Sequence, residues 1–222
     1  MSAQKRTTRR SSAGSVQPIV SDQTRKRLID AAGEMFAEFG FHQTTVRQIC
    51  LRAGANIAAV NYHFGDKTGL YTEVVRQSMQ AAQLETVRAA FDQHASAELI
   101  LRAVIKARLE SLRSLDLTDW HFRIFAHELA KPTPAMTVIV NEAIKPLYSR
   151  MCELIGSMLH LPPEHEKTRM CAHSIIGQIL FYAFARPVIS RLAPNMKLTP
   201  AQIDLIADHI AEFSLAYLSK KR

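Results

Sequence analysis

The chain has 222 residues, and its 28 Lys and Arg against 20 Asp and Glu give a formal net charge of +8. A protein this basic often binds an anionic partner, commonly nucleic acid or a membrane surface. Hydrophobic residues make up 47% of the sequence, which excludes a disordered basic tail, and the small numbers of Gly and Pro disfavour a turn-rich all-β fold.

The first twenty residues differ in composition from the rest of the chain. Residues 1–20 hold four basic side chains and no acidic one, and Ser, Thr and Gly are abundant among the others. This composition predicts a flexible basic arm, with a terminus without function and a transit peptide as alternatives. From residue 24 onward the spacing of apolar residues becomes helical.

The first predicted helix ends at a glycine, and a second one follows closely. Apolar residues at i, i+4, i+7, i+8 and i+11 from Leu28 form one helix face, and Gly40 ends that helix as a C-cap. Either Thr44 or Thr45 can cap the second helix. The pattern Thr45-x-x-Gln48 fits a capping box, which favours Thr45.

The second helix and the next one form a pair joined through Gly54. Asn56 is a good N-cap for a short third helix, Ile57–Phe64, and a fourth runs from Lys67 to about Gln93. Two short helices that meet at a tight glycine turn are a helix-turn-helix, whose second helix can enter the DNA major groove. A purely structural helix pair has the same pattern, so periodicity alone leaves both interpretations open.

The remainder of the chain reads as longer helices separated by proline or polar breaks. We expect them at about 96–115, 119–130, 135–160, 165–191 and 200–219. Pro146 should kink the third of these, and Pro187 should kink or end the fourth. The predicted class is all-α, with a small N-terminal three-helix unit and a larger helical body.

A set of motifs between residues 25 and 70 is more specific than the helix pair. The motifs are Ile29-x-x-Ala32-x-x-x-Phe36-x-x-x-Gly40-Phe41, Thr44-Thr45-Val46-x-x-Ile49, Ala53-Gly54, Val60-x-Tyr62-His63-Phe64 and Lys67-x-x-Leu70. Without a gap in their spacing, they resemble the N-terminal domain of the TetR (tetracycline repressor) family of transcription regulators. The resemblance implies a homodimeric repressor that binds a palindromic operator in double-stranded DNA and is released from it by a small-molecule effector.

The resemblance also divides the chain and assigns its location. It implies a basic arm (1–20), a helix-turn-helix DNA-binding domain (21–68) and a ligand-binding and dimerisation domain (69–222), in a cytoplasmic protein. Residues 21–75 hold six basic and six acidic side chains, so the domain expected to bind DNA is neutral in sum. Its basic side chains must therefore be sorted in space, with Arg25, Lys26, Arg27 and Lys67 towards the DNA and several acids on the far side.

Candidate DNA contacts follow from helix ends and from the matched motifs. Thr44 and Thr45 lie at a helix N-terminus, where hydroxyl and amide groups bind phosphate. Tyr62 and His63 resemble the family pair that reaches the DNA backbone, and Lys67 resembles its phosphate-binding lysine. The full predicted set is Arg25, Thr44, Thr45, Arg47, Gln48, Asn56, Ile57, Ala58, Ala59, Asn61, Tyr62, His63 and Lys67.

The recognition helix departs from the usual pattern of the family at its start. Many members carry Ser-Lys/Arg-Gly-Thr/Ser, whereas this chain has Asn56-Ile57-Ala58-Ala59, which leaves few donors for base edges. Ala58 and Ala59 suit a thymine methyl group, and Asn61 suits either adenine or a phosphate. We therefore expect backbone contacts, and the arm, to supply more of the affinity.

The C-terminal half carries a second resemblance and the candidate ligand contacts. The run His127-Glu128 followed by Pro-Thr-Pro-Ala resembles a subgroup with a CecR-like C-terminal domain. Candidate ligand contacts are Phe125, His127, Glu128, Met136, Tyr148, Phe181 and Tyr182, each of which also suits core packing. The last two helices, with the uncharged run 170–185, are expected to form the dimer interface.

Other functional classes find little support. Cys50, Cys152 and Cys171 are widely spaced, so we expect buried reduced thiols rather than disulfides or a metal site. His127-Glu128 begins like HExxH, but Lys131 stands where the second His belongs, and no cofactor motif is present. The uncharged run is too short for a membrane span. The alternative function is a helical small-molecule-binding protein or enzyme with an incidental helix pair.

Overall fold

The computed structural model describes residues 17–81, 84–114 and 119–219. Every regular element in these ranges is helical, which confirms the predicted all-α class. None of the described helices is by itself long and apolar enough to cross a membrane, and only the bent pair α10 (Glu166–Phe184) and α11 (Arg186–Leu192) meets that test when taken together. Most of the predicted basic arm lies outside the described residues.

The N-terminal part of the fold, which we call the head, consists of α1 to α4 (residues 17–81). Its helices are α1 (Gln17–Gln43), α2 (Val46–Ala53), α3 (Ile57–Phe64) and α4 (Lys67–Ala81). Helix α1 begins earlier than predicted, so residues 17–20 of the expected arm are helical. Pro18 is compatible with this start. Backbone N–H groups in the first turn of a helix have no acceptor within the helix, so a proline there loses no hydrogen bond.

The predicted caps hold α2 and α3 in place. Thr45 and Gln48 form a complete capping box at the start of α2, and Gly54 ends α2 in the left-handed conformation, with φ 59° and ψ 42°. The Asn56 side chain accepts a hydrogen bond of 2.8 Å from the Ala59 amide at the start of α3. Gly40, with φ 77°, interrupts α1 where the sequence predicts its end.

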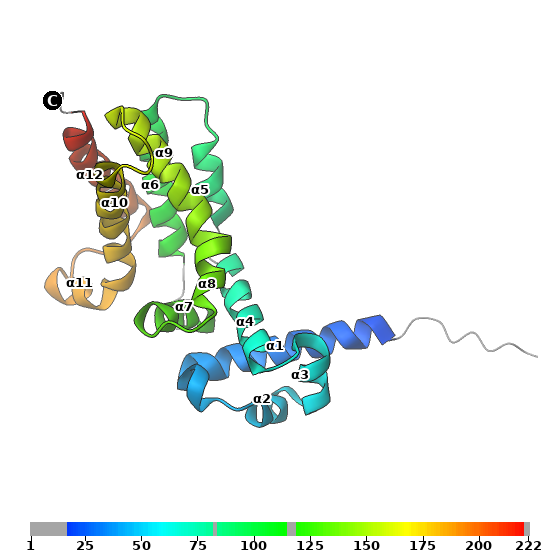
Figure 1. Cartoon of the computed structure of the whole chain (residues 1–222). Helices are drawn as coiled ribbons and strands as arrows, with labels where there is room; N and C mark the ends of the chain where they lie inside the picture. The colour runs from blue at the N-terminus through cyan, green and yellow to red at the C-terminus, as the bar shows by residue number, and fades with distance from the viewer. Residues whose placement is uncertain (1–16, 82–83, 115–118, 220–222) are drawn as a thin grey trace, which may run out of the picture.

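The remaining helices form the body (residues 84–219). In chain order they are α5 (Leu84–Phe91), α6 (Ala97–Arg113), α7 (Trp120–Ala130), α8 (Met136–Ile139), the π-helical turn η1 (Val140–Ile144), α9 (Lys145–Leu159), α10, α11 and α12 (Pro200–Leu218). Figure 1 shows α4 rising from the head towards the body, with α7 and α8 at the junction and α10 and α12 at the far side of the body.

Three predicted helices differ in detail from the structure. The expected helix from Lys67 to Gln93 is described as α4 and α5, on either side of residues 82–83. The helix expected over 135–160 contains a π-helical turn, and Pro146 lies in the first turn of α9, directly after it. A wider turn accommodates a proline that would otherwise clash with the preceding backbone. Pro187 follows a bend of 76° between α10 and α11, as predicted.

The buried side chains form two clusters. One surrounds Phe36 and Leu70 in the head but includes Ile124 of α7, Ile139 of α8 and Ala135, which directly precedes α8. The other fills the body, between α5, α6, α9, α10 and α12. Because the first cluster crosses the junction, the head and the start of the body share one core. The three cysteines are buried and free, as predicted.

Head and body approach each other closely at Gly33 in α1. A Cβ atom at this position would lie 2.5 Å from the nearest carbon of the Trp120 ring in α7. No side chain fits there without moving the indole, so the two helices can approach this closely only because residue 33 is glycine.

We expect Gly33→Ala to destabilise the protein by about 1 to 3 kcal/mol, because the added methyl group overlaps a packed ring. Urea denaturation followed by circular dichroism measures the change. In a Trp120→Leu background the same substitution should cost much less, since the ring is gone. An equal cost in both backgrounds would show that the ring contact is not the cause.

Candidate DNA-binding surface and internal pocket

Helix α3 buries Val60 fully and leaves four of its eight residues exposed to solvent. Val60 is fully buried, whereas Ala58 and Asn61 are exposed, and Ile57 and Tyr62 expose 51% and 81% of their surface. All four exposed residues belong to the predicted set of DNA contacts, whereas Ala59 of the same set is half-buried and packs against the head core. A large aromatic side chain left almost wholly in water suits a contact surface.

The start of α2 places its two threonines differently. Thr45, Arg47 and Gln48 are exposed, but Thr44 is buried. The Thr44 hydroxyl donates to the backbone oxygens of Gly40 at 2.9 Å and Met35 at 3.2 Å. The prediction that this hydroxyl binds phosphate is therefore corrected: it closes the end of α1 and faces away from solvent.

Several predicted DNA contacts are already engaged within the head. The Lys67 ammonium lies over the Phe41 ring, 4.5 Å from its centroid, and partial burial lowers its pKa. Arg25 pairs with Glu73 at 2.6 Å and lies over the Phe64 ring. These contacts restrict the positions of both cations. A phosphate would therefore meet them in a defined geometry.

The body contains a cavity of about 220 Å³ beside the junction. Its lining is mostly apolar and comes from α4, α5, α6, α7, α8, η1, α9 and α10. Of the seven predicted ligand contacts, Phe125 and Tyr148 line this cavity. His127 and Phe181 are exposed, and Met136 and Tyr182 are half-buried against the two cores, so none of these four lines it.

The sequence prediction missed Arg108, His121 and Phe122, which all line the cavity. For Arg108 a signal was present. In α6 the positions of Leu101, Val104, Arg108 and Leu112 follow one helix face, so a cation interrupts an otherwise apolar stripe. Such a break in a buried stripe is informative because charged side chains are rarely placed there without a partner or a function.

Glu128, predicted as a ligand contact, has a structural role instead. It is fully buried, and its carboxyl group accepts hydrogen bonds from the Tyr71 hydroxyl at 2.6 Å and from the Thr133 hydroxyl at 2.8 Å and amide at 3.0 Å. Burial and the neighbouring Glu128 raise the pKa of Tyr71. The carboxyl group therefore ties α4 to α7 and to the turn that follows α7.

Helix α7 is the wall that the cavity shares with the head. Its residues His121, Phe122, Phe125 and Leu129 line the cavity. The same helix packs against α1 and α4. There Trp120 covers Gly33, and the Arg123 guanidinium donates to the Ala37 carbonyl at 2.8 Å. A displacement of α7 at the cavity would therefore change its contacts with α1.

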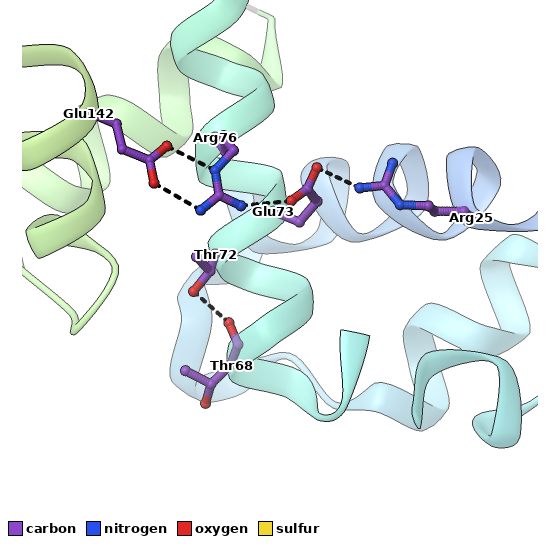
Figure 2. Close-up of polar contacts among 6 residues, drawn as sticks. All are labelled: Arg25, Thr68, Thr72, Glu73, Arg76 and Glu142. Carbon is purple, nitrogen blue, oxygen red and sulfur yellow. Dashed lines mark hydrogen bonds and ion pairs between the residues drawn. The ribbon is translucent and has the colours of Figure 1, made fainter. Parts of the chain in front are cut away.

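A chain of ion pairs makes a second connection (Figure 2). Arg76 of α4 binds Glu142 of η1 through two hydrogen bonds of 2.9 Å and Glu73 through one of 2.8 Å. Glu73 in turn pairs with Arg25 of α1. Because Ala143 and Ile144 of η1 line the cavity, this chain links the cavity wall to the head. The Arg76 pair holds the pKa of Glu142 below its usual value.

Comparisons with known proteins agree with this two-part organisation. Residues 28–74 match the family model described as bacterial regulatory proteins, tetR family. Residues 97–218 match the model described as the C-terminal domain of the HTH-type transcriptional dual regulator CecR. Together the two models cover the helix-turn-helix and nearly all of the body.

Individual relatives support the same assignment. The HTH-type transcriptional dual regulator CecR of Shigella flexneri is 31% identical over 182 residues, which are 77% of this chain and 80% of that protein. The HTH-type transcriptional regulator RutR of Escherichia coli (strain K12) is 28% identical over 149 residues, 64% of this chain and 67% of that one.

Solved structures share the fold at lower identity. SCO4454, a TetR-family transcriptional regulator from Streptomyces coelicolor, aligns with a TM-score of 0.61 and 18% identity over 90% of this chain and 97% of that one. A TetR-like transcriptional regulator from Rhodococcus sp. RHA1 gives 0.55 and 18% over 89% and 97%.

The Glu128 contacts yield a prediction about stability. Glu128→Ala should cost about 1 to 3 kcal/mol for each buried donor left without a partner, so the loss in free energy of unfolding is large. Glu128→Gln keeps one acceptor oxygen, so its free energy of unfolding should lie between those of Glu128→Ala and the wild type. Thermal melts and urea titrations measure both. A Glu128→Ala protein as stable as the wild type would remove this structural role.

Proposed function

The chain belongs to the TetR family of bacterial regulatory proteins, and on that premise we propose that it is a homodimeric repressor that a small molecule releases from its operator. The family consists of DNA-binding transcription regulators and is not enzymatic, as the sequence predicts. In this proposal residues 21–68 contact DNA, residues 69–222 bind the effector and dimerise, and the protein acts in the bacterial cytoplasm.

The exposed surface of α3 is the observation that supports DNA reading most strongly. Ile57, Ala58, Asn61 and Tyr62 face outward from one short helix whose opposite side is anchored by Val60. In the major groove, Ala58 suits a thymine methyl group and Asn61 suits adenine or a phosphate. The exposed side chains of α3 carry no full charge, so phosphate contacts must supply much of the affinity.

The phosphate contacts are assigned to side chains around α3. Tyr62 and His63 lie at the end of that helix, Thr45 and Arg47 at the start of α2, and Lys67 at the start of α4. Phosphate contacts of this kind set the position of a protein on the duplex and contribute equally on every sequence. Binding should therefore weaken steeply with salt.

The case for a homodimer comes from the outer faces of α10 and α12. Large apolar side chains stay exposed there on the described chain: Met170, Phe181, Leu205, Phe213 and Tyr217. Phe213 exposes 65% of its surface and Leu205 exposes 64%. Apolar side chains clustered on neighbouring helices suit a partner surface. A second copy with two-fold symmetry would set two α3 helices about 34 to 36 Å apart, one turn of DNA.

Release by an effector follows from the cavity and its two connections to the head. An occupant of the cavity contacts α7 and η1, and both are tied to α1 or α4 by the packing and ion pairs described above. A ligand that binds more tightly when α7 and η1 shift would move the two heads out of register with the DNA. The switch requires this difference in affinity between the two arrangements.

Three head variants test the DNA surface, with fluorescence anisotropy on duplexes from the upstream region of the gene and on random duplexes. Tyr62→Ala and Lys67→Ala should weaken binding to both duplexes alike, and Lys67→Ala, which removes a cation, should also flatten the salt dependence by about one unit. Asn61→Ala should change the preference between duplexes, by about 1 to 3 kcal/mol if Asn61 reads a base. Arg88→Ala, far from the head on α5, is the control.

The outcome that contradicts this assignment is equally specific. Wild-type affinity of Tyr62→Ala on every duplex would show that the exposed ring of α3 does not touch DNA. A salt-independent interaction would rule out phosphate contacts altogether.

A charge on the outer face of α12 tests the dimer. We expect Phe213→Glu to sediment as a monomer in analytical ultracentrifugation and to lose operator affinity, because an isolated glutamate cannot be buried between two copies. Leu51→Glu, at a residue of α2 that is even more exposed than Phe213, should leave the oligomeric state unchanged. A dimeric Phe213→Glu protein would exclude this face as the interface.

A further inference from the structure

Arg108 is a cation in the wall of an apolar cavity. It lies on the buried stripe of α6, between Val104 and Leu112, and all three residues line the cavity. The residue as a whole is half-buried, and its Nη1 atom is buried without a hydrogen-bond partner among the described residues. Burial lowers the pKa of the guanidinium to about 10, so the group still carries its charge near neutral pH.

The other polar groups of the cavity wall already have partners. The Ser78 hydroxyl donates to the Val75 carbonyl at 2.7 Å. A ring nitrogen of His121 lies 2.7 Å from the Asp119 carboxylate, and the Tyr148 hydroxyl lies 3.1 Å from His173. None of the described lining residues is Asp or Glu. The charge of Arg108 therefore faces an apolar space without a counter-ion from the wall.

A buried charged group without a partner is costly, and a ligand of opposite charge would complete the pair. We propose that Arg108 binds the carboxylate of the effector, and that the effector is an apolar monocarboxylic acid. This inference rests on the proposed function, since it names the ligand class of the same cavity. A guanidinium matches a carboxylate through two parallel hydrogen bonds.

The rest of the wall restricts the ligand further. One cation balances one negative charge, whereas a dianionic phosphate would leave a second charge among apolar side chains. Phe122, Phe125 and Ile144 line the same cavity and suit a hydrocarbon or aromatic body. The acid group is thus held by α6, while the body of the ligand lies against α7 and η1, the two elements connected to the head.

Matched probes that differ only in charge test the proposal. Isothermal titration calorimetry near pH 7 compares octanoate, decanoate and 4-phenylbutyrate with the corresponding primary alcohols. At least one acid should bind the wild type ten times more tightly than its alcohol. Arg108→Met should lose that preference, and Arg108→Lys should retain part of it. Arg102→Met is the matched control and should behave as the wild type, because Arg102 lies on the same helix but pairs with Glu98 and Asp208 and does not line the cavity.

A melting curve separates loss of binding from loss of folding. Arg108→Met removes an unpaired buried charge, so the variant without probe should melt at or above the wild-type temperature, and Arg108→Lys gives a second, conservative readout. Equal affinity for acids and alcohols, no binding of any acid, or an acid preference that survives in Arg108→Met would each overturn the proposal.

A separate measurement tests the proposed function. Anisotropy of wild-type protein with upstream DNA, without any probe, tests DNA binding alone. If the wild type binds DNA but shows no preference for acids, the ligand class is wrong and the regulator remains. If the wild type binds no DNA, the regulator proposal fails, while calorimetry still decides the role of Arg108.

Discussion

The ring of Trp120 lying on Gly33 is the contact on which the rest of the structure depends. With no side chain at residue 33, α7 can lie directly against α1. The approach lets Arg123 reach the Ala37 carbonyl, and it places His121, the neighbour of Trp120, in the cavity wall. One short helix thus lines the pocket and also packs against α1 and α4 of the head.

This arrangement explains why head and body share a core instead of meeting through a linker. Ile124 and Ile139 of the body pack with Phe36 and Leu70 of the head, and Glu128 bonds to Tyr71 across the junction. A rigid junction transmits a shift, whereas a flexible one would absorb it. Full switching, from 1:99 to 99:1, needs a ligand with about 5.5 kcal/mol of differential affinity. Apolar burial together with one charged pair is a reasonable source of that difference.

The proposed DNA-binding surface and the pocket differ in how their cations are paired and exposed to solvent. In the head, cations such as Arg25 and Lys67 are held by a carboxylate or an aromatic ring yet stay close to solvent, where a phosphate can reach them. In the pocket, Arg108 has its Nη1 group buried and lacks such a partner. The first arrangement suits a polyanion that arrives from outside, and the second suits a single charge carried inward on an apolar body.

The sequence by itself determined the features that local interactions decide. The capping box of Thr45, the left-handed Gly54 and the outward face of α3 depend on residues within four positions of one another, so composition and spacing predict them. Only the tertiary structure decided the burial of Thr44, the role of Glu128 and the lining of the pocket. Glu128 meets Tyr71 across 57 positions of sequence, and spacing says nothing about which distant groups a buried polar atom will find.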